Sequence, residues 1–107
     1  MLELNKIYNM DCYKGIKLIK DNSIDLVIID PPYILNKTSP GGCFKGTEKY
    51  ISKEYLELLD GFQVEVLFNE FKRVLKKFNL YVFCSVKQIH EVLSFVIKNN
   101  YSYNILI

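Results

Sequence analysis

This 107-residue sequence has few of the residues that build metal centres or disulfide frameworks. Its three cysteines, Cys12, Cys43 and Cys84, are far apart, whereas zinc sites use closely paired cysteines. An odd number of cysteines also fits no complete disulfide framework, and the single histidine, His90, excludes a His-rich metal site. The sequence therefore predicts no metal site and favours a reducing, cytoplasmic environment.

The chain also lacks a strong charge of either sign and any long apolar run. Its net charge of +2 supplies no positive evidence for nucleic-acid binding, although a local basic patch remains compatible with it. Every apolar run is too short to span a bilayer, and the N-terminus does not have the form of a signal peptide. At this length the chain forms one domain at most.

The most informative stretch is Asp30-Pro31-Pro32-Tyr33. It follows an apolar run, 26–29, that is typical of a strand buried on both faces of a parallel sheet. Proline fixes φ and lacks an N–H donor, so the backbone after Asp30 is stiff and its carbonyls are free to accept. An aromatic ring can stack on another planar ring, while rigid acceptors beside it accept hydrogen bonds from the exocyclic amine of that ring. The alternative is a plain strand that ends in a proline turn.

This tetrapeptide resembles the signature of methyltransferases that use S-adenosylmethionine to methylate an exocyclic nitrogen of a base. The resemblance implies that Asp30 and the Pro31 carbonyl accept hydrogen bonds from the amine. It also implies that Pro32 shapes the turn and that Tyr33 stacks on a flipped-out base. An aspartate at the first position favours adenine over cytosine. These four residues are therefore the expected catalytic residues.

The resemblance runs along nearly the whole chain. It covers 24–33, the upstream acidic turn Met10-Asp11-Cys12, and the downstream segments 71–76 and 80–84. It implies that Asp11 lies near the adenine or ribose of S-adenosylmethionine and that Asp30 also borders this cofactor. The implied partner is double-stranded DNA, within a restriction-modification system.

Periodicity and the resemblance together predict an α/β chain with a partial Rossmann-like methyltransferase fold, whose mainly parallel sheet has flanking helices. Strands are expected over 4–10, 26–29, 80–84 and 102–107. Helices are expected over 13–20, from Ser52 to about residue 78, and over 86–99. The long middle stretch is either one helix or two helices broken near Asp60-Gly61, because glycine weakens a helix. The few apolar positions of residues 34–51 predict a flexible loop, which is either a functional lid or a plain surface loop. Because active sites in open α/β sheets form at the carboxyl ends of strands, Asp11 and Asp30 are expected at one edge.

The glycine-rich turn that brings the backbone of such enzymes close to the cofactor is absent. The family's form is roughly Phe-x-Gly-x-Gly, and none of the five glycines lies in such a pattern. Because few residues precede Asp30, the chain resembles the permuted (beta-type) members, in which the catalytic half comes first. Residues 1–107 are thus expected to form one incomplete catalytic domain, inactive alone, with a missing C-terminal half or a second chain as partner. The missing strands would leave a sheet edge or an apolar face uncovered, which predicts self-association.

Two alternatives stay open. Methyltransferases that act on an RNA base or on a protein glutamine also use an Asn/Asp-Pro-Pro-Tyr turn, although they place the glycine turn upstream, where this chain has no room. The second alternative is a non-enzymatic, truncated remnant that binds nucleic acid or a partner chain. The missing glycine turn favours this alternative.

Overall fold

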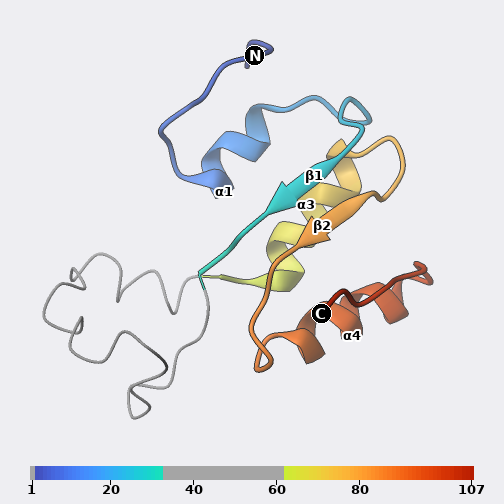
Figure 1. Cartoon of the computed structure of the whole chain (residues 1–107). Helices are drawn as coiled ribbons and strands as arrows, with labels where there is room; N and C mark the ends of the chain where they lie inside the picture. The colour runs from blue at the N-terminus through green and yellow to red at the C-terminus, as the bar shows by residue number, and fades with distance from the viewer. Residues whose placement is uncertain (1, 33–61) are drawn as a thin grey trace, which may run out of the picture.

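Two short parallel strands lie side by side at the centre of the structure (Figure 1). This computed structural model describes residues 2–32 and 62–107. Strand β1 (Val27–Ile29) pairs with β2 (Leu80–Val82), in a register that sets Ile28 opposite Tyr81. A chain of helices and strands with a small parallel sheet agrees with the α/β prediction.

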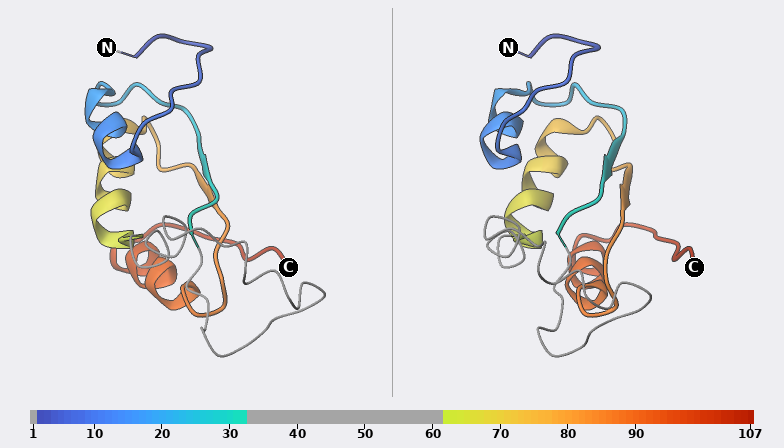
Figure 2. Two further views of the ribbon diagram at one scale, coloured as in Figure 1. Left: turned by 90° about the vertical axis from the view of Figure 1, so that its left-hand side faces the viewer. Right: turned by 60° about the vertical axis from the view of Figure 1, so that its left-hand side comes forward.

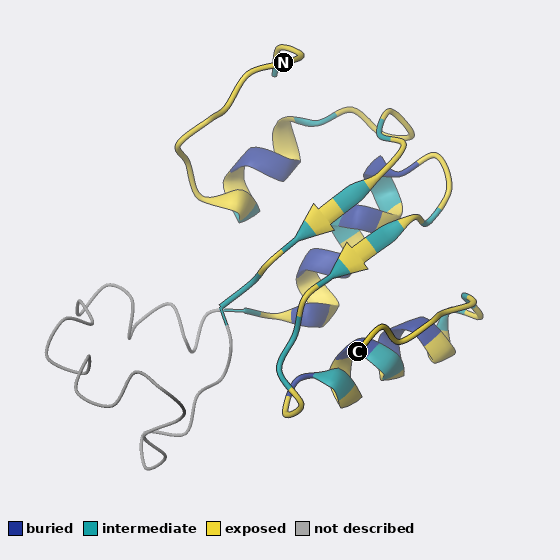
Figure 3. Cartoon of the chain, viewed as in Figure 1, coloured by how far each residue is buried: buried dark blue, intermediate teal, exposed yellow. Residues whose placement is uncertain are grey.

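Among the described residues, helices cover one face of this sheet and leave the other uncovered. The strand residues on the covered face are partly buried and pack against the core: Val27, Ile29, Leu80 and Val82. On the other face Ile28 is 63% exposed and Tyr81 is 55% exposed. Figure 3 shows an exposed, yellow band on each of the two strand arrows. The prediction of a strand buried on both faces is therefore wrong within the described residues. An apolar sheet face is open to solvent instead.

Helix α3 (Val64–Val74) supplies most of the core. Its buried residues recur every three or four positions, which is the spacing of one helix face: Val64, Leu67, Phe68, Phe71 and Val74. The ring of Phe68 meets that of Phe95 in α4 (Ile89–Lys98) edge to face, with centroids 5.3 Å apart. Figure 2 shows α3 and α1 (Cys12–Gly15) on the same side of the two strands. The core therefore lies between the strands and these helices.

Arg73, near the end of α3, fixes the segment that contains α1 and the following 3-10 turn, η1 (Ile16–Leu18). Its guanidinium donates to the carbonyl oxygens of Ile16, at 3.0 Å, and Ile19, at 2.9 Å. The same group forms ion pairs with Asp21 and Glu70. One side chain thus joins the N-terminal segment to the central helix.

Two expected strands are absent from the described part of the chain. Residues 4–10 and 102–107 have irregular backbones, and neither segment pairs with β1 or β2. The side chains of Leu4 and Leu106 are largely exposed. The prediction of strands there is wrong, because a strand is stable only where a neighbour pairs its N–H and C=O groups.

The expected helices are confirmed where they are described. The one expected over 13–20 appears as α1 and η1, and the one expected over 86–99 appears as α4. Helix α3 begins at Val64, whereas the expected helix start at Ser52 and the expected loop 34–51 lie outside the described residues. Across 2–32 and 62–107, none of the helices has the length and apolar character needed to traverse a bilayer.

Candidate functional site

Asp30 follows β1 directly, at the carboxyl end of the strand. The Phe83 N–H donates to the Ile29 carbonyl across 3.0 Å, so the strand pairing reaches the residue just before Asp30. Asp30 is exposed, while the two prolines after it are partly buried. Tyr33 lies outside the described residues, since the first described stretch ends at Pro32.

The Pro32 carbonyl is not free, which corrects the expectation of free carbonyls after Asp30. Gln88 Nε2 donates to it across 2.9 Å. The other end of the same amide, Gln88 Oε1, accepts from the N–H and the Oγ of Ser85. No hydrogen bond from a described residue reaches the Pro31 carbonyl. The sequence reasoning missed Gln88, because a glutamine just before an apolar helix gives little sign of such a contact.

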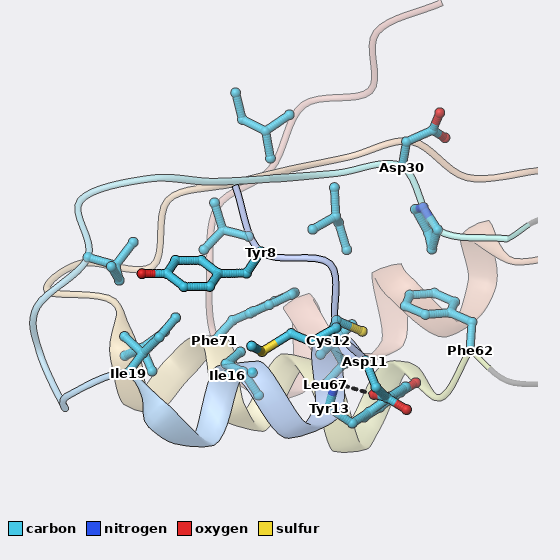
Figure 4. Close-up of a pocket in the computed structure, with 18 of the residues that line it drawn as sticks. Tyr8, Asp11, Cys12, Tyr13, Ile16, Ile19, Asp30, Phe62, Leu67 and Phe71 are labelled. Atoms are coloured by element: carbon cyan, nitrogen blue, oxygen red, sulfur yellow. Dashed lines mark hydrogen bonds between the residues drawn. The ribbon is translucent and has the colours of Figure 1, made fainter. Parts of the chain in front are cut away.

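A cavity of about 950 Å³ lies between β1, α1 and α3 (Figure 4). Asp30, Pro31 and Pro32 border it, and so does Asp11. Figure 4 shows the two aspartates on different walls, with the Asp30 carboxylate pointing away from Asp11. The other walls are largely apolar and include Ile16, Ile29, Phe62, Leu67 and Phe71. Its volume lies within the range of about 300–1,000 Å³ that small-molecule sites occupy.

Asp11 caps a helix in addition to bordering the cavity. It is the N-cap of α1, and its Oδ1 accepts from the Tyr13 N–H across 2.8 Å. Its carbonyl oxygen accepts from the N–H groups of Lys14 and Gly15. The carboxylate is therefore held in one orientation at the start of this short helix, where a negative charge is favoured.

Cys12 also borders the cavity, yet its surroundings keep it protonated. Burial, and then the negative charge of Asp11, raise the pKa of the Cys12 thiol. A raised pKa disfavours the thiolate, so this cysteine is a poor nucleophile at neutral pH. His90 is exposed on α4, next to Glu91, and does not line the cavity. Among the described residues no three His, Cys, Asp or Glu side chains gather into a possible metal site.

Comparison with known proteins finds similarity to two bacterial Type II methyltransferases. The chain is 41% identical over 73 residues to the Type II methyltransferase M.BglII of Bacillus subtilis, a match that covers 68% of this chain and 17% of that protein. It is 46% identical over 37 residues to the Type II methyltransferase M1.MboII of Moraxella bovis, which covers 35% of this chain and 14% of that protein. These similarities support a methyltransferase family. The chain spans less than a fifth of the length of either relative.

No family model and no solved structure matches the chain. The support for a methyltransferase therefore comes from sequence similarity to the two relatives. The positions of Asp11 and Asp30 on one cavity are a separate, geometric observation, and their roles in binding or catalysis stay predictions.

Proposed function

We propose that this chain is the N-terminal, motif-bearing part of an S-adenosylmethionine-dependent DNA adenine-N6 methyltransferase of the permuted (beta-type) class. The observation that carries the proposal is the position of Asp30-Pro31-Pro32 at the carboxyl end of β1, on a cavity that Asp11 also borders. Ligand sites of open α/β sheets form at such strand ends. A Rossmann-like methyltransferase fold for the whole enzyme is part of this proposal.

The two relatives support the choice of DNA over RNA or protein as the substrate, because both are Type II methyltransferases. In enzymes that modify a base, the target nucleotide leaves the duplex and enters the pocket. The small net charge of +2 leaves most of the phosphate contacts to other parts of the enzyme. A restriction enzyme of the same specificity is the expected companion.

The exposed Asp30 carboxylate and the Pro31 carbonyl, to which no residue of 2–32 or 62–107 donates, provide two hydrogen-bond acceptors on adjacent residues. Two acceptors match the two N–H donors of an exocyclic amine, so they can bind both and set the direction of the nitrogen lone pair. Pro32 restrains the backbone, and Tyr33 supplies the ring on which the base stacks. When bound, S-adenosylmethionine supplies the methyl group.

The cavity suits this cofactor in part. Its apolar walls can hold an adenine ring, and Asp11, fixed as a helix cap, offers an acceptor for the amine or ribose hydroxyls. The carboxylates of Asp11 and Asp30 also favour a positively charged ligand. The glycine-rich turn is missing from the sequence, so the remaining contacts must come from a C-terminal half or a second chain.

The test is transfer of a radiolabelled methyl group to adenine-containing duplex DNA, by the chain alone and by the chain together with the product of its genomic neighbour. We expect no activity from the chain alone and activity from the combination. In the active preparation Asp30→Ala should lower methyl transfer about 100-fold or more, since misplacing a reacting group has this effect.

Asp25→Ala is the matched control, because Asp25 lies shortly before β1 and its exposed carboxylate pairs with Lys76. It should leave methyl transfer unchanged. Full activity of Asp30→Ala would remove the role assigned to Asp30. Transfer to RNA or protein in place of DNA, or DNA binding with no methyl transfer by any preparation, would support one of the two alternative functions.

A further inference from the structure

Gln88 is the buried polar residue of the described core, with only 1% of its surface exposed. Burying an amide is unfavourable unless its polar atoms find partners. Both ends of this amide do: Nε2 donates to the Pro32 carbonyl at 2.9 Å, and Oε1 accepts from Ser85 N–H at 3.1 Å and Ser85 Oγ at 3.0 Å. The side chain therefore bridges the turn after β1 and the turn after β2.

The orientation of this amide follows from its partners. The Ser85 N–H can only donate, and the Pro32 carbonyl can only accept. Turning the amide by half a rotation would set two donors against each other at Ser85 and two acceptors against each other at Pro32. The bonds to Ser85 consequently hold the NH2 group toward Pro32.

The hydrogen bond to Pro32 has a counterpart on the other side of Asp30. There the Phe83 N–H donates to the Ile29 carbonyl at 3.0 Å. Asp30 and Pro31 thus lie between two fixed carbonyls, those of Ile29 and Pro32, and proline restricts φ at two of these positions. A backbone tied at both ends of so short a segment leaves little freedom in the direction of the Asp30 side chain and the Pro31 carbonyl.

We infer that Gln88 is a positioning residue for amine recognition. By fixing the Pro32 carbonyl, it sets the directions in which Asp30 and the Pro31 carbonyl accept hydrogen bonds from the target amine. This inference rests on the proposed function for its consequence in catalysis. Its structural part, the restraint of the Asp30–Pro32 turn, is independent of that function.

The structural part is tested by hydrogen exchange measured with mass spectrometry on the 107-residue chain. The substitution Gln88→Met keeps an apolar side chain of similar length and removes both hydrogen bonds. We expect exchange at the Phe83 amide, which donates to the Ile29 carbonyl at the start of this turn, to become about two- to tenfold faster, which corresponds to the loss of one hydrogen bond. Gln88→Glu should have the same effect there, although it keeps an acceptor for Ser85, because its carboxylate cannot donate to Pro32.

Gln63, which is exposed, provides the matched controls. Gln63→Met and Gln63→Glu make the same chemical changes and should leave the exchange rate at the Phe83 amide unchanged. Circular dichroism of each variant verifies that it remains folded. If Gln88→Glu does not fold, Gln88→Met still decides the question. Unchanged exchange at the Phe83 amide in a folded Gln88→Met chain would overturn the inference.

The catalytic part is tested in the active preparation that methylates DNA. Gln88→Met should lower kcat by up to about 100-fold while the dissociation constant for DNA and the KM stay close to wild type. A merely structural role would lower the amount of folded enzyme and leave kcat per folded molecule unchanged, and that result would refute positioning. If the wild-type preparation transfers no methyl group while Gln88→Met still loosens the turn, the proposed function fails and the restraint of the turn by Gln88 stands.

Discussion

Truncating Phe68 to alanine removes the side chain on which the two main helices meet. Phe68 is fully buried on α3, and its ring centroid lies 5.3 Å from that of Phe95, 5.6 Å from that of Phe71 and 6.4 Å from that of Phe62. Phe→Ala in a packed core costs about 3–5 kcal/mol, from lost burial and from the cavity left behind. A natural domain is stable by only about 5–15 kcal/mol, and the uncovered sheet face here favours the lower end. At that lower end Phe68→Ala should leave about 0–2 kcal/mol of stability, so that between a few per cent and about half of the population is unfolded at 25 °C.

The measurement is urea unfolding followed by far-ultraviolet circular dichroism. Val66→Ala is the control, because Val66 lies on the same helix but is 48% exposed. It should change the free energy of unfolding by no more than about 0.5 kcal/mol. A loss below about 1 kcal/mol for Phe68→Ala would show that α3 and α4 do not form the core as described. A large loss for Val66→Ala would show that the exposed side of α3 is covered in solution.

Three further predictions concern the site and the open sheet face. Tyr33→Ala should weaken the flipped-out state of the target base by about 1–3 kcal/mol, the range for a lost base–aromatic stack, as measured with a fluorescent base analogue in the active preparation. Tyr33→Phe should have little effect there, and an equal loss in both variants would contradict stacking. Because the pKa of Cys12 is raised, its thiolate forms only at higher pH, so its alkylation by iodoacetamide should reach half its maximal rate above the pH found for a free thiol. A midpoint at or below that pH would contradict the assigned surroundings. Ile28→Lys, which places a charge on the uncovered sheet face, should reduce self-association in sedimentation experiments without altering the circular dichroism spectrum, and unchanged association would exclude this face as its cause.

The local sequence by itself determined those elements that depend on the spacing of apolar residues along the chain or on a proline. The three- and four-residue spacing of Val64 to Val74 specifies α3, because any helix with that spacing buries one side. The apolar run 26–29 identifies β1. The two prolines identify the turn after Asp30, since proline restricts φ wherever it occurs. The candidate catalytic residues are named from the resemblance of Asp30-Pro31-Pro32-Tyr33 to a methyltransferase signature, which is also a local pattern, and their roles stay predictions.

Only the tertiary structure decided where partners far apart in the sequence meet. Residues 4–10 and 102–107 have strand-like composition and yet form no strand, because pairing depends on a neighbour and not on composition. The guanidinium of Arg73 binds the carbonyls of Ile16 and Ile19, which lie 57 and 54 positions away in the sequence. The amide of Gln88 reaches Pro32 across 56 positions of the chain. A hydrogen bond depends on distance and direction in space, and these are properties of the folded chain that no local pattern of residues encodes.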